Sequence, residues 1–317
     1  MADIDKIIER AENDANILAI GTEGSGNDPD QTPDEWTDLD VTLFAADPDQ
    51  VDAKAWVNAL GATKLVQHLH DTHLFGPATG AWESWLTRYQ GTRRIDWKIA
   101  PAADEAAYLA ADHLNAIIWR QGQGRVTPRA TDASSHFLTA PTQADYEATL
   151  NEIFWIAGNV IKGLSRNNLL YANEQFNAHL RPQVLTLYAY RETLAQDGHF
   201  DPGVNFKNVW PKLASYEQSQ LAATYDQSSR AATLASLKNC VVIVESLVDE
   251  FNDDQTLLRP AWLGPADAQV TSWFFDLTAP LNAEKKAQEA ASAKQKEEIA
   301  KRHAAKRAAY YEGNQQK

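Results

Sequence analysis

The sequence has 317 residues, enough for two domains, and its 44% apolar and 23% charged residues are typical of a globular protein. No apolar run is long enough to cross a membrane, residues 1–12 lack a signal-peptide core, and the single cysteine, Cys240, excludes an internal disulfide, so we expect a cytoplasmic protein. The net charge of −14 excludes nucleic acid as an expected partner and favours cations.

The first 140 residues predict a mixed α/β domain. The expected elements, in chain order, are a helix at 2–14, strands at 16–22 and 38–45, a helix at 51–60, strands at 64–70, 82–89 and 93–100, and a helix at 102–111. Between the first two strands, Gly24-Ser25-Gly26 is a turn signal, and a polar loop follows it. Residues 112–141 follow no clear pattern.

A helical pattern with a period near 3.6 residues begins at Pro141-Thr142 and continues to about residue 252. Thr142 and Asp145 suit an N-cap pair, and Pro182 should kink or end a helix. We therefore predict the α+β class, with a mixed-sheet domain at 1–140 and an all-α domain at 141–280. The charged tail at 281–317 is expected to be helical or flexible, without a core of its own.

The acidity is concentrated outside the tail. Residues 283–317 have nine basic and five acidic side chains, a net charge of +4, so the remaining residues carry −18. Such an acidic body attracts metal ions or a polyamine-like substrate. Solubility alone would also account for this charge.

Three aspartates in the first domain form a candidate metal site. Asp38 and Asp40 lie about 7 Å apart along one strand and point the same way, while the residues between and after them face the core. Asp96 repeats this alternation on a later strand. If the two strands are neighbours, three carboxylates converge, and such a group can hold Mg²⁺ together with substrate phosphates.

Gly24-Ser25 precedes the first aspartate pair, between a strand and an expected helix, and the free N–H groups of a helix N-terminus suit a phosphate. An Asp-x-Asp pair by itself is more often a solvated strand end. The order Gly-Ser, then Asp-x-Asp on a strand, then a single aspartate on a later strand is much more specific.

These motifs resemble those of the aminoglycoside 6-adenylyltransferase (streptomycin adenylyltransferase) family, within the DNA polymerase β-like nucleotidyltransferases. The similar blocks, in chain order, are Gly24-Ser25, Asp38-Leu39-Asp40-Val41, Arg94-Ile95-Asp96, Asn151-Glu152-x-x-Trp155, Lys162-Gly163-Leu164-x-Arg166 and Arg181-Pro182. The resemblance covers roughly residues 1–255. It implies a nucleotidyltransferase domain at 1–140, a helical substrate- and nucleotide-binding domain at 141–280, and a site between them.

Two positions depart from the pattern of that family. Gly26 stands where the family usually has the arginine of Gly-Ser-Arg, and Gln90-Gly91 stands where it usually has an acidic residue shortly before Arg-Ile-Asp. Lost contacts at either position could weaken ATP binding or change the acceptor.

A polar stripe is expected on the first helix of the second domain. Glu152, Trp155, Asn159, Lys162 and Arg166 are spaced three and four residues apart, so they share one face, opposite an apolar face. By itself this stripe reads as a solvated surface, with the tryptophan at the edge of the core. The resemblance implies that it faces the nucleotide, with Lys162 on the phosphates, Arg166 beside it, and Glu152 as general base.

Two further groups have weaker signals. Glu174 could bind an ammonium group of the acceptor or be an ordinary surface acid. His68, His70 and His73 form a His-x-His-x-x-His cluster that could suit zinc, although only Asp71 is near enough in the sequence to complete such a site.

The resemblance and the site chemistry together imply an adenylyltransferase. Two Mg²⁺ ions held by Asp38, Asp40 and Asp96 would assist the attack of an aminoglycoside hydroxyl on the α-phosphate of ATP, and pyrophosphate would leave. A nucleotide-binding protein of this fold without turnover and a nucleotidyltransferase for another acceptor remain as alternatives. No membrane and no nucleic acid is expected as a partner.

Overall fold

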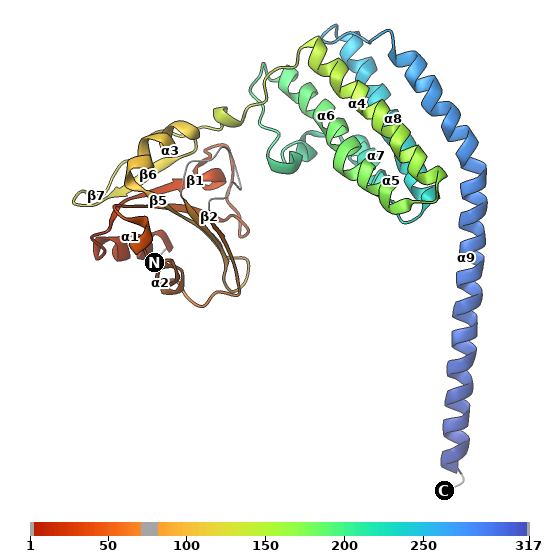
Figure 1. Cartoon of the computed structure of the whole chain (residues 1–317), viewed down its shortest axis with the longest axis horizontal. Coiled ribbons are helices and arrows are strands. Elements are labelled where there is room, and N and C mark those ends of the chain that lie inside the picture. Colours follow the sequence, from red (N-terminus) through yellow and green to blue (C-terminus); the bar gives the residue numbers. More distant parts are fainter. Residues whose placement is uncertain (1–2, 71–81, 316–317) are drawn as a thin grey trace. The chain divides into compact units, whose positions relative to one another are not determined.

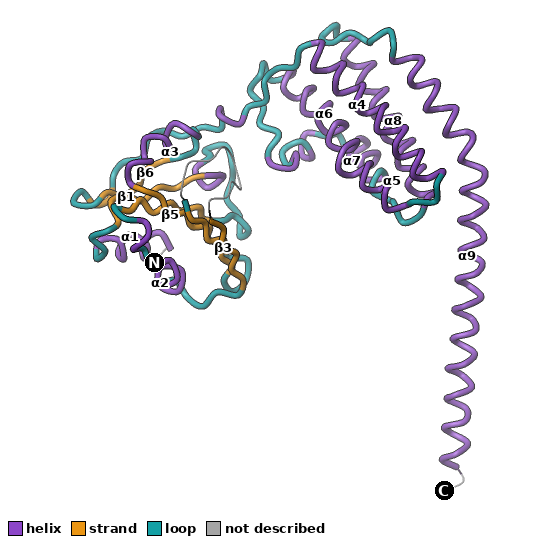
Figure 2. Tube along the Cα trace, in the orientation of Figure 1, coloured by secondary structure: helices purple, strands orange, loops and turns teal. Residues whose placement is uncertain are grey.

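The computed structural model describes residues 3–70 and 82–315, which separate into two compact units, Met1–Phe137 and Leu138–Lys317 (Figure 1). The first unit is built on a sheet and the second is helical (Figure 2). The predicted α+β class is therefore confirmed.

In the described part of the first unit, seven strands form one mixed sheet in the order β3-β4-β5-β2-β1-β6-β7. The strands are β1 (Ile17–Glu23), β2 (Leu39–Ala45), β3 (Leu65–His70), β4 (Glu83–Arg88), β5 (Arg94–Pro101), β6 (Ala116–Arg120) and β7 (Gly124–Arg125). Strands β2 and β5 are parallel, and the other pairs are antiparallel. The parallel pair brings the strand with Asp40 beside the strand with Asp96, which the aspartate hypothesis requires.

The two faces of the sheet are covered by different helices. Helices α1 (Asp3–Glu12) and α2 (Ala53–Ala59) pack on the face that contains Val41, Leu43 and Trp97. Helix α3 (Glu105–Ala111) covers the other face, where the buried ring of Tyr108 lies against Phe44. Both faces of β2 are thus buried, and the side that holds Asp40 is less open to water than simple alternation predicts.

The second unit is a helical bundle. Its helices are α4 (Gln143–Ser165), α5 (Leu169–Gln175), α6 (Arg181–Ala195), α7 (Ser215–Ala223), α8 (Arg230–Asp253) and α9 (Leu263–Gln315). The expected cap is present, because Thr142 and Asp145 exchange side-chain and backbone hydrogen bonds at the start of α4. A π-helical turn, Phe176–Leu180, joins α5 to α6, and Pro182 stands in the first turn of α6, so the regular helix is interrupted just before the proline as predicted.

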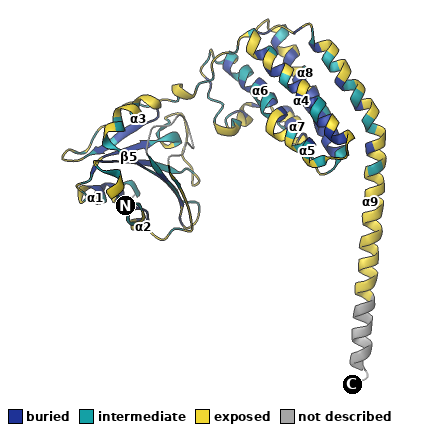
Figure 3. Cartoon of the chain, in the orientation of Figure 1, coloured by how far each residue is buried: buried dark blue, intermediate teal, exposed yellow. Residues whose placement is uncertain are grey.

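Helices α8 and α9 both contribute to the core of the bundle. By length and composition α8 could cross a membrane, but most of it is buried in the bundle, where Cys240 is also buried. Helix α9 begins at Leu263, well before the expected tail, and its first part contributes Leu263, Val270 and Phe274 to the bundle core. Leu281, at the start of the expected tail, is also buried in the bundle core, and from Lys285 to Ala304 the side chains are exposed (Figure 3).

Candidate functional site

Strand register aligns acidic side chains across the centre of the sheet. Glu23 on β1 is paired with Asp40 on β2, and Asp40 is paired with Asp96 on β5. Cross-strand partners point to the same face, and here that face is the one opposite α1 and α2. Three neighbouring strands therefore each contribute one carboxylate to a single row.

Asp38 completes the candidate metal site from the residue directly before β2. One carboxylate oxygen from each of Asp38, Asp40 and Asp96 lies within 4.8 Å of the other two. The convergence that alternation predicts is therefore present. Asp96 is buried, with 4% of its surface exposed, while Asp38 and Asp40 are half-buried. A solvated strand end would leave all three carboxylates open to water.

Backbone geometry fixes the Gly-Ser turn against this group. Gly24 has φ of +70°, and a Cβ atom built on it would lie 2.6 Å from Oδ2 of Asp40. Glycine is thus required for the backbone conformation and for the close approach of the carboxylate. The expected α-helix after the turn is wrong, however, because Gly24–Asn27 is a single 3₁₀ turn followed by a loop. Ser25 therefore lies in a short turn next to Gly24, which approaches Asp40, and not at the start of an α-helix.

Burial and mutual repulsion change the acidity of the aspartates. Desolvation, with the negative charges of Asp38, Glu23 and Asp96 as further causes, raises the pKa of Asp40 from 3.8 to about 8. Desolvation also raises the pKa of Asp96, against the opposing effect of Arg94. Without a cation the group is thus short of positive charge, and near neutral pH Asp40 retains a proton.

Two basic residues contact this acidic row, and the sequence alone assigned neither of them a role in the site. Arg94 spans two aspartates, with Nη1 3.2 Å from Oδ2 of Asp38 and Nε donating to Oδ1 of Asp96 at 2.9 Å. Lys98 lies one pair further along β5 and forms an ion pair with Glu23 at 2.8 Å. Alternation already places Lys98 on the face of Asp96, but pairing it with Glu23 requires the strand order.

The donor set fits a hard divalent cation. Carboxylate oxygens are the ligands that Mg²⁺ prefers, and Mg²⁺ commonly takes one or two carboxylates plus water and phosphate oxygens. The cluster offers three carboxylates and neither cysteine nor histidine, so it does not resemble a zinc site. The aspartates can therefore hold the metal that nucleotidyl transfer uses.

The predicted stripe on α4 is present in the second unit. Its apolar side is buried, and Trp155 is 71% exposed, so the reading of this tryptophan as a cap on the core edge is wrong. Lys162 is exposed, donates to Oδ1 of Asn159 at 3.1 Å and lies over the ring of Tyr171. A large exposed indole near an exposed ammonium on one helix is a surface suited to a ligand.

The other predicted residues of this unit are half-buried or exposed. Glu152 is half-buried on the same helix, Arg166 is exposed at the C-cap of α4, and Glu174 is exposed on α5. Among the residues that the structure describes, none forms an ion pair with any of these three side chains.

The histidine cluster lies away from the aspartates. His68 and His70 contact the two oxygens of Glu83 at 2.6 and 2.8 Å, and strand pairing puts them on the Trp97 face. His73 falls outside the described residues. Among the described residues, the aspartates are the group whose ligand atoms meet closely enough for a metal ion, so we do not propose zinc here.

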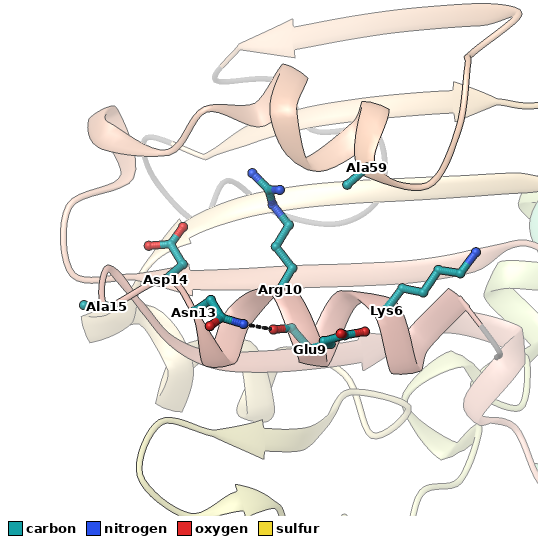
Figure 4. Close-up of a pocket in the computed structure, with 7 residues that line it drawn as sticks. All are labelled: Lys6, Glu9, Arg10, Asn13, Asp14, Ala15 and Ala59. Atoms are coloured by element: carbon teal, nitrogen blue, oxygen red, sulfur yellow. Dashed lines mark hydrogen bonds between the residues drawn. The ribbon is translucent and has the colours of Figure 1, made fainter.

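A cavity of about 810 Å³ lies beside α1, and Figure 4 shows its lining residues. Arg10 points from α1 toward Ala59 at the end of α2, and its guanidinium lies over the ring of Trp56. Because α1 and α2 cover the face opposite the aspartates, this cavity is not part of the candidate site.

The two departures from the family pattern lie in turns. A Cβ atom on Gly26 would come no closer than 3.9 Å to the backbone oxygen of Asp38, so this position has room for a Cβ atom. Gln90-Gly91 forms the tight turn between β4 and β5, and Gly91 has φ of +73°. Both turns lie at the end of the sheet where Asp38 and Asp96 stand.

Comparison with known proteins gives a consistent result. The model of the family described as streptomycin adenylyltransferase matches residues 2–260. Two curated relatives, both called aminoglycoside 6-adenylyltransferase, are 25% identical: one from Bacillus subtilis (76% of this chain, 85% of the relative) and one from Campylobacter jejuni (78% and 85%). The crystal structure of an aminoglycoside 6-adenyltransferase from Bacillus subtilis matches with a TM-score of 0.43 and 20% identity, over 86% of this chain and 97% of that one.

Proposed function

Because the chain belongs to the streptomycin adenylyltransferase family and is thus a nucleotidyltransferase, we propose that it transfers AMP from ATP to an aminoglycoside hydroxyl and releases pyrophosphate. The observation that carries this proposal is the convergence of Asp38, Asp40 and Asp96 beside the Gly24-Ser25 turn. The relatives are named as aminoglycoside adenylyltransferases, which supports the same acceptor class here.

The aspartates supply the charge on which the transfer depends. Two Mg²⁺ ions at this cluster would stabilise the attacking and the leaving oxygens of an in-line displacement at the α-phosphate. Asp40 and Asp96 are fixed by adjacent strands, and Asp38 extends the group at the strand end. Gly24 allows the backbone to approach Asp40, so that Ser25 can donate to a phosphate close to the metal ligands.

The stripe on α4 is proposed to bind the other parts of the substrates. Lys162 and Arg166 supply positive charge for the triphosphate, and Lys162 is exposed, donates to Asn159 and lies over the ring of Tyr171. Glu152 is the proposed general base for the acceptor hydroxyl, and Glu174 the proposed partner of an acceptor ammonium group. The charge changes sign along the helix, from Glu152 to Lys162 and Arg166, as a cationic acceptor and an anionic nucleotide would require.

The acidity of the chain supports a cationic acceptor. Residues 1–282 carry −18 and would repel ATP, so the charge is of no direct benefit to the nucleotide. Aminoglycosides are polycations with several hydroxyls, and an acidic surface raises their local concentration. Streptomycin is the first compound to test, because the matching family is described by that antibiotic.

The decisive experiment incubates the protein with Mg²⁺, α-labelled ATP and a panel of aminoglycosides, and follows both label transfer and pyrophosphate release. We expect labelled AMP on an aminoglycoside, streptomycin first, and no transfer by Asp40→Asn. Asp49→Asn is the matched control, because Asp49 is an exposed aspartate that lies after β2 and outside the cluster. Nucleotide binding without transfer to any member of the panel would contradict the proposal.

A further inference from the structure

Arg94 contacts two of the three aspartates of the candidate metal site. Its guanidinium reaches Asp38 through Nη1 at 3.2 Å, and it reaches Asp96 through Nε at 2.9 Å and through a second bond from Nη2. The side chain is 28% exposed, so it is held by these carboxylates and not enclosed by the core. One arginine thus bridges two of the three aspartates.

The same carboxylates are the proposed ligands of the metal. A guanidinium and a divalent cation within a few ångströms repel each other, and the arginine also uses carboxylate lone pairs that the metal would take. Arg94 and the metal therefore compete for Asp38 and Asp96. Lys98 competes less directly, because its ammonium forms an ion pair with Glu23 at 2.8 Å.

A displaced guanidinium has a suitable second partner nearby. Asp96 is paired across the sheet with Asp40, and Asp40 lies against Gly24 in the turn where we expect the nucleotide phosphates. The fork of an arginine matches the geometry of carboxylates and phosphates equally well. The partial exposure of Arg94 leaves its side chain room to turn from one anion to the other.

We propose that Arg94 is a resident counter-ion, which holds Asp38 and Asp96 together in the metal-free protein and moves to the nucleotide phosphates when the divalent cation binds. This role rests on the proposed function for the identity of the ligands. It couples the two binding events, because the metal releases the arginine and the released arginine strengthens the binding of the nucleotide. Arg94 is in this account a positioning residue for the nucleotide and a competitor of the metal.

The test compares Arg94→Gln with Arg93→Gln. Arg93 is the adjacent residue, is 34% exposed, and forms an ion pair with Asp3 at 2.7 Å. Its substitution therefore removes the same charge without changing a contact of the metal-site aspartates. Mn²⁺ binding is measured by electron paramagnetic resonance at about pH 8, the value to which the pKa of Asp40 is raised, to limit competition from protons. Nucleotide binding is measured by calorimetry with α,β-methylene-ATP, which cannot donate AMP.

Opposite changes in the two affinities are expected for Arg94→Gln. Without nucleotide, Mn²⁺ should bind on the order of tenfold more tightly than to the wild type, while the nucleotide in the presence of Mn²⁺ should bind on the order of tenfold more weakly. The cooperativity between metal and nucleotide should fall in this variant alone. Arg93→Gln should leave both affinities near those of the wild type.

The proposal is overturned if Arg94→Gln weakens Mn²⁺ binding, because Arg94 would then order the aspartates and not compete for them. Circular dichroism identifies a variant that fails to fold, and Arg94→Lys, which keeps the charge but loses the fork, then provides the comparison. The Mn²⁺ affinity of Arg94→Lys should lie close to that of the wild type, and its nucleotide affinity should be lower. These binding measurements do not require turnover. A protein that transfers AMP to none of the acceptors would therefore contradict the proposed function but leave this test valid.

Discussion

Replacing Asp40 by asparagine should stabilise the metal-free fold while abolishing adenylyl transfer. Burial and its acidic neighbours raise the pKa of Asp40 from 3.8 to about 8, so the folded protein disfavours its charged form. At 1.36 kcal/mol per pKa unit, the raised pKa of Asp40 lowers the stability of the fold at pH 7 by at most about 4 kcal/mol, because the ionised carboxylate of the unfolded chain must take up a proton on folding. Because the side chain is half-buried, we expect the variant to gain roughly 2 kcal/mol at that pH.

The sign and the pH window of this effect follow from linkage. A carboxyl group whose pKa is raised in the fold binds more protons in the native than in the unfolded protein between pH 3.8 and about 8. The wild type should therefore lose stability as the pH rises through this window, and the asparagine variant should lose less. The difference between them should be near zero at acid pH, grow with pH, and level off above about 8.

Urea unfolding in the presence of EDTA, at a series of pH values, measures this difference directly. Adding Mg²⁺ should stabilise the wild type by roughly 2.7 kcal/mol at a concentration one hundred times the dissociation constant, and should not stabilise Asp40→Asn. Asp49→Asn, an exposed aspartate without cluster contacts, should follow the wild type throughout. A less stable Asp40→Asn protein, or a stability difference independent of pH, would refute the electrostatic reasoning.

Three further outcomes are expected. Lys98→Met should move the acidic limb of the pH–activity profile to higher pH, because Lys98 lowers the pKa of Asp40; an unmoved limb would rule out that contribution. Gly24→Ala should reduce kcat/KM by roughly tenfold or more, since alanine must adopt φ of +70° and its Cβ would meet Asp40, and activity equal to that of the wild type would contradict this account of the turn. The acceptor KM should rise with salt, because exposed charges are screened over roughly 8 Å at physiological ionic strength, and a KM indifferent to salt would separate acidity from acceptor binding.

Local patterns in the sequence predicted the elements of the site well. Alternation along 38–45 and 93–100 indicated which side of each strand faces the core, and the buried Val41 and Trp97 agree with it. The capping pair at Thr142 followed from residue types alone. Each of these features depends on neighbours within a few positions of the chain, where periodicity and side-chain chemistry are sufficient.

Long-range pairings could not be obtained in this way. The register that aligns Asp40 with Asp96 joins strands separated by β3 and β4, so no local signal specifies it. The pairing of Glu23 with Lys98 needs the order β5-β2-β1, and this order was unknown from the sequence. The Gly24 turn was misjudged for another reason, because a short 3₁₀ turn and the first turn of an α-helix use similar residues.

Repulsion among the buried carboxylates of the aspartate cluster destabilises the fold, and other interactions in the first unit must offset this. The raised pKa values of Asp40 and Asp96 show that neither carboxylate is fully compensated in the metal-free protein, even with Arg94 in contact. The strands that carry them are central in the sheet and buried on both faces, so apolar packing can balance this cost without dispersing the charges. Carboxylates that pointed into solvent would destabilise the fold less, but their oxygens would no longer be held within 4.8 Å of one another. The destabilisation is therefore the consequence of keeping the ligands preorganised, and a bound cation would convert the same repulsion into affinity.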